Sequence, residues 1–108
     1  MGSVVTKLFY VVAQLYAYPG KEAEFREYEM QALRIVRKHG GELVCAFTPE
    51  CMDANAETPT EIHVLRFVDR DAFDTFMSDP EHAAIADWRA TVIRKTVIVV
   101  SGEIVDYV

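Results

Sequence analysis

The stretch that decides the fold runs from Glu61 to His82 and reads EIHVLRFVDRDAFDTFMSDPEH. A strand pattern over Glu61–Val68 leads through an Asp-rich turn into an amphipathic helix. Asp69 or Asp71 is placed to cap that helix, and Pro80 in the first turn of a new segment favours a restart. The stretch therefore predicts a strand followed by a helix that is broken or kinked near Pro80.

The other elements are predicted from changes in the hydrophobic period on either side of this stretch. An amphipathic helix begins at Glu22 and is stopped by Gly40-Gly41, whose freedom at positive φ suits a helix end. The segment 52–60 has no period and predicts the loop of a long hairpin, which makes the strands around it antiparallel neighbours. We expect further strands over Leu8–Ala17, Glu42 to about Pro49, Thr96–Val100 and Glu103–Val108. The predicted order is β-α-β-β-α-β plus a short terminal strand, an α+β fold.

Length and composition narrow the class of protein. A chain of 108 residues predicts a single domain over 1–108. A hydrophobic fraction of 51% predicts a large core or an apolar surface reserved for a partner, and a homodimer is the simplest explanation. A net charge of -6 argues against nucleic acid as a partner. No apolar run approaches the roughly 20 residues that span a bilayer, so we expect a cytoplasmic protein without a membrane partner.

The two cysteines, Cys45 and Cys51, are spaced too far apart along one extended segment to form a disulfide. No histidine or third cysteine stands near them at zinc spacing. We therefore expect two partly buried free thiols and no metal site.

Three motifs carry a family resemblance: Tyr18-Pro19-Gly20-Lys21 after the first strand, His39-Gly40-Gly41-Glu42-Leu43 at the helix stop, and Arg66-Phe67-x5-Phe73-x2-Phe76-x-Ser78-Asp79-Pro80. With the element order, they make the chain resemble the dimeric α+β barrel superfamily, which contains antibiotic-biosynthesis-monooxygenase-like proteins and several uncharacterised families. The resemblance implies a ferredoxin-like βαββαβ sandwich with an antiparallel sheet, two subunits of which form a barrel. Members include cofactor-independent quinone-forming oxygenases, haem-degrading enzymes, lactone isomerases and proteins of no known activity.

The haem-degrading members are the ones that this chain resembles least. They have an Asn on the first strand, a Trp at the end of the third and a His in the second helix, and the matching positions here are Ala13, Phe67 and about Ile85. Ferric haem without an axial histidine is poorly held. We therefore expect no haem and no other cofactor.

His63 is the candidate catalytic base. It shares a strand face with Glu61, Leu65 and Phe67, and the resemblance turns this face toward the cleft between helices and sheet. Histidine titrates near neutral pH and is a common general base, which suits proton abstraction from a small phenolic or enolic molecule. The alternative is a core histidine that is bonded to one neighbour.

Arg66 lies on the opposite, barrel-side face, where the first strand offers Tyr10, Gln14 and Tyr16. A buried guanidinium there needs either a carboxylate of a partner subunit or an anionic ligand, and we favour the ion pair with the partner. The two faces thus hold rival pockets, between which the sequence does not choose.

Trp88 either covers the sheet or lines the cleft, whereas His82, six residues away on another side of the helix, is expected to be solvated. The helix aromatics Phe25, Tyr28, Phe73 and Phe76 have core spacing, and the alternative is that they wall an apolar pocket.

These residues lead to two hypotheses. The first is a homodimeric, cofactor-independent oxygenase or isomerase acting on a small aromatic or polyketide-like molecule. His63 would be its base, Arg66 or Gln14 the polar anchor, Tyr10 and Phe67 further substrate contacts, and Trp88 a cleft wall. The second is a non-catalytic dimer that binds a small ligand or serves a structural role.

Overall fold

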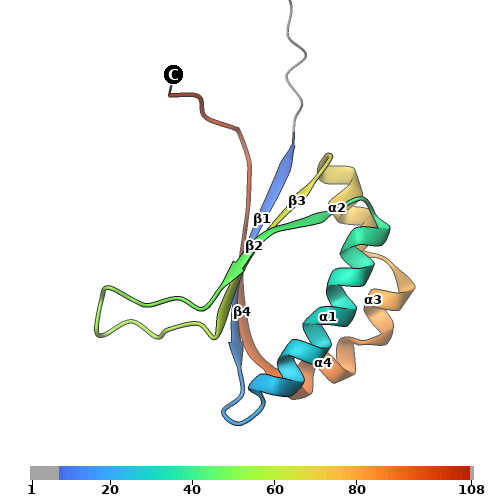
Figure 1. Ribbon diagram of the computed structural model, residues 1–108. Coiled ribbons are helices and arrows are strands. Elements are labelled where there is room, and N and C mark those ends of the chain that lie inside the picture. The colour runs from blue at the N-terminus through green and yellow to red at the C-terminus, as the bar shows by residue number, and fades with distance from the viewer. Residues whose placement is uncertain (1–7, 108) are drawn as a thin grey trace, which may run out of the picture.

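The computed structural model describes residues 8–107 and has two layers, a sheet and a set of helices that all lie on one side of it (Figure 1). The elements are β1 (Phe9–Ala17), α1 (Glu22–Lys38), β2 (Glu42–Phe47), β3 (Glu61–Phe67), α2 (Arg70–Met77), α3 (Pro80–Ala84), α4 (Ala86–Val92) and β4 (Ile93–Val100). The four-stranded sheet has the order β2-β3-β1-β4, and every neighbouring pair is antiparallel. This is the predicted ferredoxin-like α+β fold.

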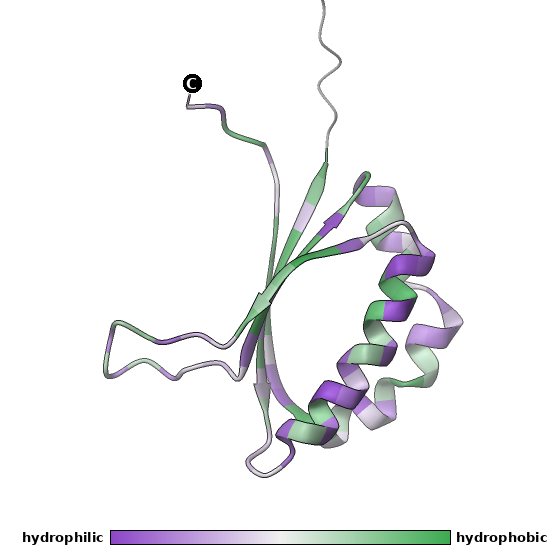
Figure 2. Ribbon diagram, viewed as in Figure 1, coloured by the Kyte–Doolittle hydropathy of each residue, from purple (hydrophilic) through white to green (hydrophobic). Residues whose placement is uncertain are grey.

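β1 is a central strand, and its alternation places one apolar face against the helices. Val11 lies opposite Leu65 of β3 and opposite Val100 of β4, so the centre of the core crosses three strands. Side chains from β1, β3, α1 and α2 form one core cluster, and a second cluster joins β1 to α1 and the end of α4. Figure 2 shows the hydrophobic side of α1 turned toward the sheet and its hydrophilic side turned away.

The end of α1 brings that helix close to the sheet. Gly40 has a φ of +75°, which favours glycine because a side chain would strain the backbone there. Gly41 is needed for a different reason: a Cβ at this position would lie 2.6 Å from Cγ1 of Val36 and 2.7 Å from Cε1 of Phe67. The glycine pair therefore ends the helix and lets the chain enter β2 in contact with the core.

The predicted break near Pro80 is confirmed, and a second break follows it. α2 is capped by Asp69, which accepts from the Ala72 amide at 2.8 Å, and α3 by Asp79, which accepts from the Glu81 amide at 2.7 Å. The chain then leaves helical geometry at Ile85 (φ -101°, ψ 7°) before α4 begins. This second break was not predicted, because no proline or glycine marks it.

The terminal strand predicted over Glu103–Val108 is wrong as far as Tyr107, since residues 101–107 form no strand; Val108 lies outside the described residues. Ser101 ends the pairing of β4 with β1: its amide donates to the Tyr10 carbonyl at 2.8 Å, and its hydroxyl accepts from the Tyr10 amide at 2.9 Å. The alternating pattern after Ser101 has no neighbouring strand to pair with.

Both cysteines are free thiols, but they are exposed rather than partly buried. Cys45 lies on the sheet face that no helix covers, and Cys51 lies in the long loop that projects from the body in Figure 1. Among residues 8–107, no helix combines the length and the apolar character that crossing a membrane requires. The cytoplasmic location stays a prediction.

Candidate functional site

A cavity of about 520 Å³ lies between the helices and the sheet, on the side predicted for His63. Its lining is mostly apolar. The lining residues come from all the helices and three of the strands: Val11, Ala13, Leu15, Tyr28, Glu29, Ala32, Leu33, Val36, His63, Leu65, Phe73, Phe76, Met77, His82, Arg89, Thr96 and Ile98.

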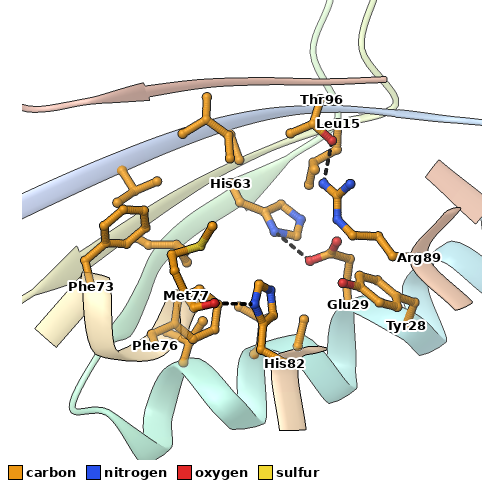
Figure 3. A pocket seen from close by; sticks show the side chains of 17 residues that line it. Leu15, Tyr28, Glu29, His63, Phe73, Phe76, Met77, His82, Arg89 and Thr96 are labelled. Atoms are coloured by element: carbon orange, nitrogen blue, oxygen red, sulfur yellow. Dashed lines mark hydrogen bonds and ion pairs between the residues drawn. The ribbon is translucent and has the colours of Figure 1, made fainter. Parts of the chain in front are cut away.

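The cavity has two chemically different ends, with His63 between them (Figure 3). Phe73, Phe76 and Met77 form the aromatic end together with His82, whose ring lies 4.6 Å from that of Phe76. The opposite, polar end carries Tyr28, Glu29, Arg89 and Thr96. His82, which was expected to be solvated, is partly exposed and also lines the cavity.

His63 is buried on β3 and held by a carboxylate on the same strand face. Its Nε2 lies 2.8 Å from Oε1 of Glu61, and Oε2 of Glu61 accepts from Nε of Arg26 at 2.9 Å. An ionised carboxylate only accepts hydrogen bonds, so this geometry places a proton on Nε2 of His63. The other ring nitrogen, Nδ1, is thereby directed to the cavity side, where Glu29 stands.

Glu29 faces His63 from α1, with Oε2 3.5 Å from Nδ1 (Figure 3). Burial raises the pKa of the Glu29 carboxyl above its ordinary value, and the nearby Glu61 adds to that rise, while His63 and Arg89 oppose it. A carboxyl group and an imidazole nitrogen therefore face each other inside a largely apolar cavity.

Arg89 reaches the polar end from α4. One of its guanidinium nitrogens donates to Oγ1 of Thr96 at 2.5 Å. Burial raises the pKa of the neighbouring Tyr28 to about 12 against the opposing effect of Arg89, so the phenol remains neutral at physiological pH. Arg89 is thus a cation beside two neutral hydroxyl groups.

Two residues that were predicted to contact a substrate, Phe67 and Trp88, pack against lining residues instead of lining the cavity. Phe67 is completely buried, with its ring centre 5.6 Å from that of Phe73 and 5.7 Å from that of Phe76, and it does not line the cavity. This packing leaves Phe67 outside the lining of the cavity, and a substrate contact for it stays a prediction. Trp88 meets the ring of Tyr28 edge-on at 5.4 Å, so it supports a lining residue rather than lining the cavity itself.

Tyr10, Gln14 and Arg66 lie on the opposite, open face of the sheet and do not join His63. Tyr10 is the cross-strand neighbour of Arg66, and Gln14 accepts from the Tyr16 hydroxyl at 3.4 Å. Arg66 is about one-third exposed and donates to Oε1 of Glu42 at 2.7 Å, because Glu42 is its register partner on β2. Arg66 therefore has a carboxylate partner within its own chain, and the expected ion pair with a partner subunit stays a prediction.

Sequence reasoning missed Glu29 and Arg89 as site residues, although a signal existed. Glu29 stands four residues after Phe25 and three before Ala32, and Arg89 stands four after Ile85 and three before Val92, so both charges fall within apolar helix stripes. A charge in such a stripe marks a buried polar position. Across residues 8–107, no cluster of three His, Cys, Asp or Glu side chains is arranged to hold a metal ion.

Solved structures share this fold at low sequence identity. A protein of unknown function from Rhodopseudomonas palustris has a TM-score of 0.77 at 14% identity, with 94% of this chain and 86% of that one covered. A putative antibiotic biosynthesis monooxygenase from Bacteroides thetaiotaomicron has a TM-score of 0.68 at 10% identity, covering 94% and 93%. SnoaB, a cofactor-independent oxygenase from Streptomyces nogalater, has a TM-score of 0.68 at 14% identity, covering 93% and 96%. These likenesses confirm the antibiotic-biosynthesis-monooxygenase-like fold.

No protein with a curated description matches the chain significantly. One family model does match, and it spans residues 9–103, from the first residue of β1 to just beyond β4. The match includes every element that lines the cavity. The chain therefore belongs to the family described as Domain of unknown function (DUF1330).

Proposed function

We propose that the protein is an enzyme that moves a proton on a small, largely apolar molecule, with Glu29 and His63 as the acid–base pair. The observation that carries this proposal is the buried Glu29 carboxyl, with its raised pKa, 3.5 Å from Nδ1 of His63 in the cavity. A carboxyl whose pKa moves toward neutrality is suited to give and take a proton at physiological pH.

The geometry suggests a separate role for each of these side chains. Glu61 holds His63 through Nε2 and is itself held by Arg26, so the imidazole ring is fixed in orientation. Glu29 and Nδ1 then face a bound molecule together, one as acid and the other as base. Apolar walls exclude water, which keeps an abstracted proton on the pair and protects the carbanion or enolate.

Two reactions begin with that enolate, and both fit a site without a cofactor. In an isomerisation, the proton returns to a different carbon. In an oxygenation, the enolate reduces O₂: a methylene becomes a carbonyl, one oxygen atom stays in the product and the other leaves as water. The likeness to SnoaB, whose name states a cofactor-independent oxygenase, supports the second reaction at the level of fold only.

Deuterium exchange into 2-tetralone, a neutral ketone with acidic C–H bonds, tests the proposal by NMR without knowledge of the natural substrate. We expect the protein to accelerate exchange over buffer, and Glu29→Gln and His63→Gln each to lower the protein-dependent rate roughly 100- to 10,000-fold. Glu27→Gln, which removes an exposed carboxylate from the same helix, is the matched control and should leave the rate unchanged. Oxygen uptake then separates oxygenation from isomerisation.

The alternative function is a non-catalytic dimer that binds a small ligand. It predicts no exchange above buffer in the wild type, or the same exchange in Glu29→Gln as in the wild type. Either result would remove the acid–base role and leave the cavity as a binding site.

We further propose that two copies pair through the open sheet face. All helices lie on the other side of the sheet, and the open face carries exposed Phe47, Val97 and Val99. A second copy brings an identical apolar face, so a two-fold axis makes the surface complementary to itself. Native mass spectrometry of the protein purified from its host reads both the stoichiometry and any retained small molecule.

A further inference from the structure

Arg89 is a cation inside the cavity whose charge is not matched by a dedicated carboxylate. Its guanidinium donates to the Thr96 hydroxyl and interacts with the Tyr28 phenol, and none of the ion pairs seen among residues 8–107 joins it to an Asp or Glu. The nearest influence of a carboxylate comes from Glu29, which is engaged with His63 and which burial holds toward its neutral form. A partly buried guanidinium in this state favours an anion.

The apolar part of the cavity beyond Arg89 favours an anionic group on a larger molecule over a free inorganic ion. From the polar end, the cavity continues past His63 to Phe73, Phe76 and Met77, and most of its wall is apolar (Figure 3). A volume of about 520 Å³ suits a molecule of one or two rings. The occupant therefore needs a charged head and an aromatic or other apolar body.

The charged residues around the cavity favour a ligand head group with a single negative charge. Within residues 8–107, Arg89 is the one arginine or lysine that lines the cavity, whereas Glu29 lines it as well and Glu61 is bonded to His63. The whole chain carries a net charge of -6, which further disfavours a dianion such as a phosphate monoester. A carboxylate has one charge and matches the fork of a guanidinium.

We propose that the cavity takes a small aromatic monocarboxylate, with its carboxylate on Arg89 and its ring toward Phe73 and Phe76. The proposal deepens the proposed function, on which it rests for the reacting position: in this orientation the carbon between head and ring lies beside His63 and Glu29. Thr96 and Tyr28 supply the hydroxyl groups that position the guanidinium and the carboxylate.

Isothermal titration calorimetry at pH 7.5 tests the proposal with 2-naphthylacetate and with 2-naphthylacetamide, which has the same shape and no charge. We expect the carboxylate to bind the wild type roughly 10- to 100-fold more tightly than the amide, the range for hydrogen bonds to charged groups. Arg89→Gln should reduce the affinity for the carboxylate to that for the amide. Arg34→Gln, which removes an exposed arginine that donates to Gln31 within α1, should keep the full preference.

Equal binding of the two probes, a preference that survives Arg89→Gln, or failure of both probes to bind would each overturn the proposal. If circular dichroism shows that Arg89→Gln does not fold, Arg89→Lys replaces it; a point charge without the fork should retain only part of the preference.

Glu29→Gln separates this proposal from the proposed function. It should abolish deuterium exchange but keep or tighten binding of the carboxylate, because it removes a negative charge near Arg89. If Glu29→Gln loses exchange but still prefers the carboxylate over the amide, the proposed carboxylate site stands, whichever reaction the protein catalyses. If the wild type catalyses exchange but does not prefer the carboxylate over the amide, the proton-transfer proposal stands and the proposed carboxylate site does not.

Discussion

At the residue scale, the site places two carboxylates around one imidazole and gives them different surroundings. Glu61 accepts from Arg26, whose side chain is 60% exposed, so this carboxylate has a cationic neighbour at the edge of the protein. Glu29 stands inside the cavity, where burial raises its pKa. These different environments agree with the two proposed roles, in which Glu61 positions His63 and Glu29 carries a proton.

The raised pKa of Glu29 predicts a pH-dependent stability effect of Glu29→Gln. The folded protein keeps the Glu29 proton at higher pH than the unfolded chain does, so stability is lost as pH rises above the ordinary value of 4.5 and through the folded pKa. Glutamine cannot ionise. We expect the variant to gain unfolding free energy relative to the wild type between pH 4 and pH 7, as measured by urea denaturation at both values.

A difference between the two proteins that stays constant from pH 4 to pH 7, or one that moves in favour of the wild type, would contradict this reading of Glu29. Glu27→Gln serves as the control, since Glu27 is exposed on the same helix.

The sequence predicted the residue that stands at the centre of the cavity, but not the residues around it. His63 was identifiable because a polar residue alternates with apolar ones on β3. Glu29 and Arg89 become its neighbours only when α1 and α4 cross the sheet, and that geometry depends on packing between distant elements. The apolar stripes alone indicate that these two charges are buried, not that they meet.

At the element scale, α1 and the strands were predictable from their hydrophobic periods of 3.6 and 2, although the strand register shifts between Tyr16 and Ala17 and between Leu43 and Cys45. The second helix was harder to predict: Pro80 marks one break, while the break at Ile85, between α3 and α4, has no residue signal. The expected final strand failed for a related reason. An alternating pattern forms a strand only when a neighbour is available, and the chain leaves β1 at Ser101.

Asp79 joins α1 to α3 and so holds the corner that walls the aromatic end of the cavity. Oδ2 of Asp79 lies 2.6 Å from Nε2 of His39 and 2.9 Å from Nζ of Lys38, and Oδ1 caps α3. The hydrogen bond from His39, then those from Lys38 and the Glu81 amide, hold the pKa of Asp79 well below its ordinary value.

This lowered pKa predicts the behaviour of Asp79→Asn. The contribution of the carboxylate is present above the ordinary value of 3.8 and is lost as pH falls toward the folded pKa. We expect the variant to be less stable than the wild type at pH 7 in urea denaturation, and the difference to shrink below about pH 4. Asp87→Asn, at an exposed position on α4, should change little, and an equal loss in both variants would refute a special role for Asp79.

Phe67 provides a separate test of the packing between the sheet and the helices. Because it is fully buried among Phe73 and Phe76, Phe67→Ala should lower the unfolding free energy by about 3–5 kcal/mol. Met30→Ala, at a position that is 68% exposed, should stay within about 0.5 kcal/mol of the wild type. A small loss for Phe67→Ala would favour the original expectation that this ring contacts a ligand.

At the scale of the whole molecule, the fold has one covered and one open sheet face. The hydrophobic fraction of 51% raised the question of where the apolar surface goes, and the open face answers part of it. A sheet with exposed valines on one side is unusual for a protein that stays monomeric. The proposed pairing of two copies would bury this face and produce the barrel that the family resemblance implies.

Val99→Asp tests that pairing, because Val99 is 57% exposed on the open face. Burying an unpaired carboxylate in the interface should weaken the dimer by roughly tenfold or more and leave the monomer folded. Analytical ultracentrifugation measures the change, and Met30→Asp, on α1 on the other side of the sheet, is the control. A wild-type monomer, or a dimer that is equally weakened by Met30→Asp, would count against the open face as the interface.

The proposed acid–base pair of Glu29 and His63 is tested most directly by a pH titration of the Glu29 carboxyl carbon by ¹³C NMR. Glu29→Gln assigns the signal. We expect a pKa above the ordinary 4.5, and a further rise in His63→Gln, because His63 is the group that most opposes the effect of burial. A pKa of Glu29 at or below 4.5, or a pKa that does not change in His63→Gln, would contradict the acid–base pair.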